Sequence, residues 1–63
     1  MWTVVYIAPN RKEAETIQNN LTAEGLLVKL RAIGALPSGS NSSVEVLVPE
    51  SEVDEAMEVI NAR

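Results

Sequence analysis

An apolar segment that stops at a proline opens the chain and limits what it can fold into. Residues 2–8, WTVVYIA, are few and rich in β-branched and aromatic side chains, which is typical of a β-strand. Pro9 ends the strand because proline has no N–H to donate to a sheet. Alternate side chains point to opposite faces, and both sets are apolar: Trp2, Val4 and Tyr6 on one face, Thr3, Val5 and Ile7 on the other. Either set can form the core. In one case Trp2 and Tyr6 lie beneath the helices, and in the other they lie on an exposed face.

A helix is expected directly after this strand. Asn10 is a good N-cap residue, and Glu13 is placed to reach back to the amide of the cap, so the helix begins at Arg11. Gly25 ends it because glycine readily adopts the left-handed conformation after a helix. The apolar stripe between these ends is narrow and consists of Ala14, Ile17 and Leu21.

Two further strands and a second helix are predicted in the rest of the chain. Residues 26–33, LLVKLRAI, and 44–48, VEVLV, alternate as strands do, and Pro49 ends the latter. Residues 34–43, GALPSGSNSS, form a long loop between them. Ser51 is then expected to cap the second helix with Asp54 as its partner. The core stripe of that helix is predicted to be Val53, Ala56, Met57 and Ile60.

The element order βαββα predicts a single α+β domain over residues 1–63. A right-handed crossover makes the first and second strands parallel, and the third is most compactly inserted between them, giving a truncated ferredoxin-like split βαβ unit. The predicted three-stranded sheet has the order 1-3-2, with both helices on one face. A meander of order 1-2-3 is the alternative that the pattern leaves open. In either case no helix remains to cover the second sheet face, and the order 1-3-2 leaves the first strand with an unpaired edge.

Composition excludes several classes of function. The 63 residues include no cysteine and no histidine, which removes disulfides, thiolate nucleophiles, zinc sites and imidazole bases. A domain this small gains little stability from its core, so oligomerisation is the support that remains. The net charge of −4 argues against nucleic-acid binding. Because no long apolar segment or secretory signal is recognised, we expect a cytoplasmic protein that does not contact membranes.

The chain resembles a family of short prokaryotic proteins of unknown function that are described as signal-transducing proteins. The resemblance runs over MWTVVYIAPNRKEAETI, EGLLVKLRAIG and VEVLVPESEVDEAMEVIN, which is essentially the whole chain. It implies a ferredoxin-like, P-II-like domain of βαββα order. Some short members carry the label glutamate decarboxylase, but no catalytic residue can be matched to this sequence. The resemblance transfers no site residues.

Catalysis is not expected of this chain. A decarboxylase that uses pyridoxal phosphate needs a Schiff-base lysine, a partner for the ring nitrogen and a phosphate cradle. Only Lys12 and Lys29 are available for the first role, and a chain of this length has little room to enclose a cofactor and a substrate. We therefore predict no enzyme activity, no cofactor and no metal.

Two binding surfaces remain as candidates. The helix start at Asn10, Arg11 and Lys12 offers backbone amides and positive charge to a small anion or nucleotide, with the 34–43 loop beside it, although capping is the simpler role. Lys29 and Arg31 share one strand face and are placed to pair with Glu45 across the sheet. The candidate interface residues lie on the sheet face without helices: Trp2, Val5, Ile7, Lys29, Arg31, Glu45 and Leu47.

We expect a regulatory or adaptor protein that acts through protein contacts at this face and at the strand edges, as a homodimer or with another chain. Its place in signal transduction is what the family resemblance implies. The alternative is a small-ligand sensor that uses Asn10 to Lys12.

Overall fold

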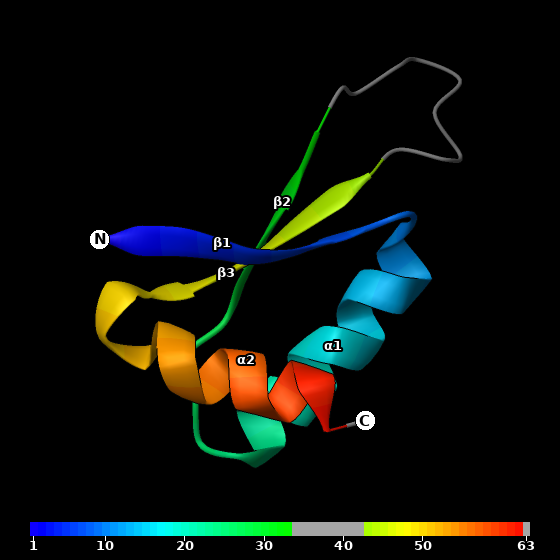
Figure 1. Ribbon diagram of the computed structural model, residues 1–63. Coiled ribbons are helices and arrows are strands. Elements are labelled where there is room, and N and C mark those ends of the chain that lie inside the picture. The colour runs from blue at the N-terminus through cyan, green and yellow to red at the C-terminus, as the bar shows by residue number, and fades with distance from the viewer. Residues whose placement is uncertain (34–42, 63) are drawn as a thin grey trace.

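Three strands and two α-helices make up the part of the chain that the structure, a computed structural model, describes: residues 1–33 and 43–62. The predicted loop at 34–43 lies outside these residues except for Ser43. In chain order the elements are β1 (Trp2–Ala8), α1 (Arg11–Ala23), β2 (Lys29–Ala32), β3 (Val44–Pro49), a 3-10 turn η1 (Glu50–Glu52) and α2 (Val53–Asn61) (Figure 1).

The sheet has the order β1-β3-β2, so β3 is its central strand. Both outer strands pair with β3 in antiparallel orientation, which makes β1 and β2 parallel to each other. The split arrangement predicted from the sequence is therefore confirmed, and the meander of order 1-2-3 is not adopted. Both helices lie on one face of this sheet (Figure 1).

The core lies between β3 and the two helices. Val46 and Val48 of β3 are fully buried, as are Ile17 and Leu21 of α1 and Ala56 of α2. Burial of each large aliphatic side chain contributes about 1.5–3 kcal/mol. The central strand thus supplies one aliphatic wall, and each helix adds a narrow apolar stripe against it.

A β-bulge in β1 decides which of its side chains reach the core. Val4 pairs with Leu47 and Tyr6 pairs with Val46, so Val5 is an extra residue without a partner position on β3. One inserted residue reverses the alternation of a strand from that point onward. Val5 and Tyr6 both pack against the core as a result. Neither strict alternation considered for β1 is correct: Trp2 and Tyr6 do not share a face, and Val5 is not on the exposed face with Ile7.

Both ends of α1 follow the sequence prediction. Asn10 is the N-cap, and its Oδ1 accepts a hydrogen bond from the Glu13 amide at 2.8 Å. At the other end Gly25 has a φ of +84°. The Gly25 amide then donates to the Thr22 carbonyl at 2.9 Å, and the Leu26 amide donates to the Leu21 carbonyl at 3.2 Å. This is the Schellman pattern, in which an apolar residue after the helix packs on its last turn.

Because Leu26 belongs to this helix end, β2 is shorter than the predicted 26–33 and begins at Lys29. The next amide, that of Leu27, donates to Glu52 Oε1 at 3.1 Å and not to the sheet. The α1–β2 connection is in this way tied to η1.

The start of α2 differs from the prediction. Ser51 does not cap a helix, since it lies inside η1, and α2 begins at Val53 with no side-chain hydrogen bond at its N-cap. The predicted core stripe is correct for Val53, Ala56 and Ile60 but wrong for Met57, which is 38% exposed. Val59 packs against the core instead of Met57, because the side of α2 that contains Val59 faces α1.

Candidate interaction surface

One face of the sheet is covered by neither helix in the described part of the chain (Figure 1). We call it the open face and define it by the side chains that the strand register places there. They are Trp2, Val4 and Ile7 of β1, Lys29 and Arg31 of β2, and Glu45 and Leu47 of β3.

The open face carries exposed apolar side chains from β1. Trp2 is 43% exposed, Val4 is 36% exposed and Ile7 is 57% exposed. Sequence reasoning missed Val4, because the bulge that places Val4 and Ile7 on the same face interrupts the alternation of the strand. The candidate residue Val5, in contrast, lies against the core and is no part of this surface.

Leu47 lies at the centre of the open face, yet it is only 3% exposed. Its neighbours across the sheet are Val4 on one side and Lys29 on the other. The Lys29 Nζ lies 5.6 Å from the centroid of the Trp2 ring, so side chains from the two outer strands meet above the central one. Leu47 thus lies on the sheet face predicted for it, but it is buried there and offers a partner little surface.

The second cross-strand pair on the open face is ionic. Both Nε and Nη2 of Arg31 lie 2.6 Å from Oε1 of Glu45, which confirms the cross-strand pairing predicted from the sequence. The Arg31 side chain is 61% exposed, so this pair is screened by solvent and contributes about 0.2–1 kcal/mol. Ile7 is opposite Glu45 in the register, so the ion pair lies beside an exposed apolar side chain.

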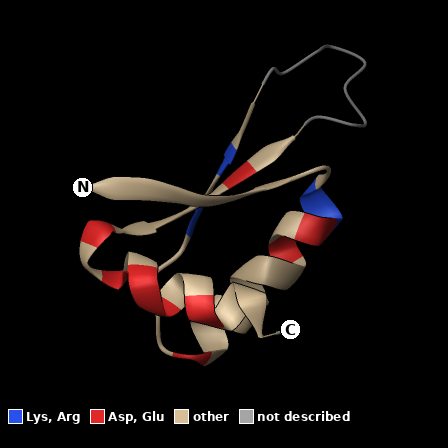
Figure 2. Cartoon of the chain, in the orientation of Figure 1, with Lys and Arg blue, Asp and Glu red and all other residues tan. Residues whose placement is uncertain are grey.

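The two sides of the molecule differ in charge. The open face has two basic residues, Lys29 and Arg31, and one acidic residue, Glu45. The segment from η1 through α2 has acidic residues and no basic ones, as Figure 2 shows. The acidic residues are Glu50, Glu52, Asp54, Glu55 and Glu58. A charged partner therefore meets a different field at the open face than at η1 and α2, whereas α1 has charges of both signs.

The helix start at Asn10 to Lys12 is chiefly a cap. The Asn10 side chain accepts from the amide of Glu13, which removes one donor that an anion would need. The Arg11 Nε lies 3.2 Å from Oε2 of Glu15, an exposed pair one turn apart. Two of the three residues proposed as an anion site thus already have partners within the chain. Anion binding at this helix start stays the untested alternative to its role as a cap.

Outside the open face and the helix start, the described chain has a groove between the two helices. Within residues 1–33 and 43–62, no group of three or more acidic side chains is placed to hold a metal ion. No helix in the same residues is long and apolar enough to cross a membrane. A shallow groove runs between the C-terminal ends of α1 and α2, and it is lined by Asn20, Ala23, Glu24, Glu58, Val59 and Ala62.

Comparisons of the chain with protein-family models, with curated proteins and with solved structures gave no match.

Proposed function

We propose that the chain is a non-catalytic regulatory or adaptor protein that binds proteins, a second copy of itself or another chain, through the open face and the strand edges. The observation that supports this proposal is the set of three exposed apolar side chains, Trp2, Val4 and Ile7, on a sheet face without helices. Contiguous apolar surface of this kind is a feature of protein interfaces.

Trp2 is the residue best suited to anchor a partner. Tryptophan is enriched at the residues that dominate interface energies, because one side chain buries a large area and still offers an N–H donor. Trp2 is the single tryptophan of the chain, and the Lys29 ammonium group lies over its ring. A ring that already makes such a contact loses less conformational entropy when a partner covers it.

The residues also support a role without catalysis. The lysine on the open face, Lys29, has its ammonium group over an exposed indole ring and not in an enclosed pocket. The other lysine, Lys12, lies on the exposed first turn of α1. A Schiff-base lysine needs a site closed to water, and neither position offers one. A role in signal transduction and a cytoplasmic location belong to the same proposal.

Two substitutions of exposed aliphatic residues test the open face. Ile7→Ser removes an apolar side chain that is 57% exposed on the open face, and Leu27→Ser removes one that is 62% exposed in the connection before β2 begins. We expect sedimentation to detect a larger species that grows with concentration in the parent chain and in Leu27→Ser but is diminished in Ile7→Ser.

If the partner is another chain, capture from native extract replaces sedimentation. The parent chain and Leu27→Ser should then capture the partner, and Ile7→Ser should capture less of it. The fluorescence of Trp2 gives a second measurement, since covering its ring shifts the emission to shorter wavelength. The proposal is wrong if Ile7→Ser and Leu27→Ser associate alike and the Trp2 emission does not change with concentration or with added partner.

A further inference from the structure

The outer edge of β1 has neither the charges nor the proline that protect many edge strands, and a bulge is the one such feature in the strand. β1 ends the sheet and pairs with β3 on one side only among the described residues. Its seven residues, WTVVYIA, include no charged residue and no proline. Native proteins commonly protect such an edge with charges or proline. The bulge at Val5 bends β1 but adds no charge, whereas the other edge strand, β2, has Lys29 and Arg31 among its four residues.

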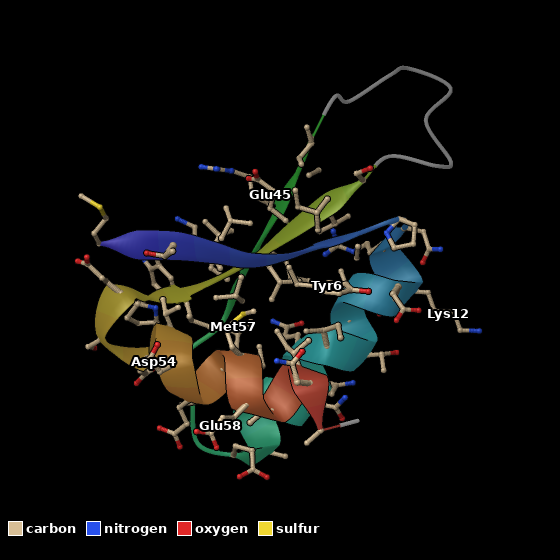
Figure 3. The ribbon with its side chains drawn as sticks, viewed as in Figure 1. Tyr6, Lys12, Glu45, Asp54, Met57 and Glu58 are labelled. Atoms are coloured by element: carbon tan, nitrogen blue, oxygen red, sulfur yellow. The ribbon has the colours of Figure 1, made fainter. Side chains whose placement is uncertain are left out.

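Helix α2 places an exposed apolar side chain beside this edge. Its main contacts with the sheet are to β1 and β3, whereas α1 packs against all three strands, so α2 lies toward the β1 side of the sheet. Val59 faces α1, because it lines the groove between the two helices. Met57 is two residues away, about 200° around the helix, and therefore lies on the side opposite α1. Figure 3 shows Met57 directed from α2 toward the sheet, and it is 38% exposed.

We propose that the β1 edge and Met57 together bind an extended basic peptide, which pairs with β1 as a fourth strand. This inference rests on the proposed function, that the chain binds proteins, and it names the class of partner. Backbone pairing with an exposed sheet edge is a general mode of peptide recognition. Side chains on one face of the added strand would continue the apolar surface of Val4 and Ile7, and those on the other face would contact Met57.

The negative charge of η1 and α2 favours a basic peptide over an acidic one. Asp54 precedes Met57 by three residues and thus lies on the same side of the helix, and no basic residue is present from Glu50 to Asn61. A lysine or arginine of the added strand can pack its aliphatic stem on Met57 and extend its charged end toward Asp54. A second copy paired through β1 would instead bring two acidic α2 helices together, and like charges oppose that contact.

A short synthetic peptide tests this inference. We use acetylated and amidated KVKVKVK as the probe and EVEVEVE as the charge control, and follow the backbone amide resonances of the intact chain. KVKVKVK is expected to move the resonances of residues 2–8 more than those of β2 and to slow their hydrogen exchange. Its affinity should fall as salt rises. EVEVEVE is expected to bind at least tenfold more weakly.

Two further controls separate strand pairing from nonspecific attraction. KVKVKVK with N-methyl groups on two consecutive central residues keeps its charge but cannot pair along either edge, so it should not bind. Asp54→Asn should weaken KVKVKVK about two- to fivefold, the size expected of one exposed ion pair. Glu24→Gln, a matched loss of one acidic charge at the far end of α1, should leave the affinity unchanged.

The inference is overturned if the N-methylated peptide binds as tightly as KVKVKVK, if EVEVEVE binds equally well, or if the resonances of β2 move and those of β1 do not. It is also overturned if the chain alone sediments at twice its mass and the β1 amides that point away from β3 are already protected from exchange. A second copy would then occupy the edge. Association that depends on Ile7, found together with an edge that binds no peptide, would refute this inference and keep the proposed function. Peptide binding at the β1 edge, found together with association that does not depend on Ile7, would refute the open face as the binding surface and keep the peptide site.

Discussion

The ammonium group of Lys29 lies 5.6 Å from the centroid of the Trp2 ring, although the two residues belong to the two outer strands of the sheet. Those strands are separated by β3, a distance of about 10 Å for two strand spacings. The contact therefore crosses the central strand, and Leu47 beneath it is only 3% exposed. The open face therefore has one buried side chain, Leu47, at its centre, although no helix covers this face.

Lys29 is expected to stabilise the fold through this contact. A cation over an exposed indole ring contributes about 0.5–1 kcal/mol, and the aliphatic stem of Lys29 also shields Leu47. We predict that Lys29→Ala lowers the free energy of unfolding by about 1 kcal/mol. Urea unfolding followed by circular dichroism measures the change. Lys12→Ala, on an exposed helical turn, is the control and should change the free energy by less than about 0.5 kcal/mol; equal losses in both variants would refute the role of Lys29.

Leu47 is expected to behave as a core residue. Removing a buried leucine side chain costs about 2–5 kcal/mol, which is comparable to the whole stability of a domain of this size. Leu47→Ala should therefore be largely unfolded by circular dichroism at room temperature. Ile7→Ala, an exposed residue on the same face, should remain folded. A folded Leu47→Ala chain with near-parental stability would show that the side chains above Leu47 do not exclude water.

Much of the fold could be predicted from local signals in the sequence. The cap at Asn10 and the helix end at Gly25 follow from residue types at short spacing. The strand order 1-3-2 was the more compact of two right-handed arrangements, and the sequence pattern left the order 1-2-3 open. The Arg31–Glu45 pair was also predictable, because both residues alternate onto the polar side of their strands.

The composition of the open face could be predicted only in part. The bulge at Val5 depends on how β1 aligns with β3, a relation between residues about forty positions apart that no local pattern records. The burial of Leu47 depends on two long side chains that meet above it. The position of Met57 depends on where α1 lies beside α2, and the 3-10 turn before α2 shifted the expected cap at Ser51. Except for the local turn at Ser51, these errors arose where tertiary contacts decide the orientation of a side chain.

Gly25 provides a test of backbone conformation without a packing change. Its φ of +84° is unfavourable for residues with a Cβ, and nothing lies within 4 Å of the position that a Cβ would occupy. Gly25→Ala is expected to lower the free energy of unfolding by about 1–2 kcal/mol through backbone strain alone. Gly25→Asn should lose less, since asparagine tolerates the left-handed region. Thermal unfolding measures the stability of both variants. If Gly25→Ala is as stable as the parent chain, the conformation at Gly25 is not strained for residues with a Cβ.

The cap at Asn10 is predicted to contribute about 1 kcal/mol, because its Oδ1 accepts from the Glu13 amide. Asn10→Ala should lose this contribution, which corresponds to a fall of about 4–8 °C in Tm for a domain of this size. Asn10→Asp keeps an acceptor at the same position and should retain the parental Tm within a degree or two. A Tm that falls equally in both variants would show that the hydrogen bond is not the source of the stability.

The same helix start gives the sharpest test of the small-ligand alternative. An anion that binds at Asn10 to Lys12 competes with the Asn10 side chain for the Glu13 amide and with Glu15 for Arg11. Both exchanges cost hydrogen bonds that the chain already makes, so we predict no specific binding of phosphate or of a nucleoside triphosphate. Titration with each should leave the amide resonances of residues 9–13 unmoved at physiological salt. Saturable shifts in these amides, lost in Arg11→Gln and kept in Arg31→Gln, would instead establish the helix start as an anion site.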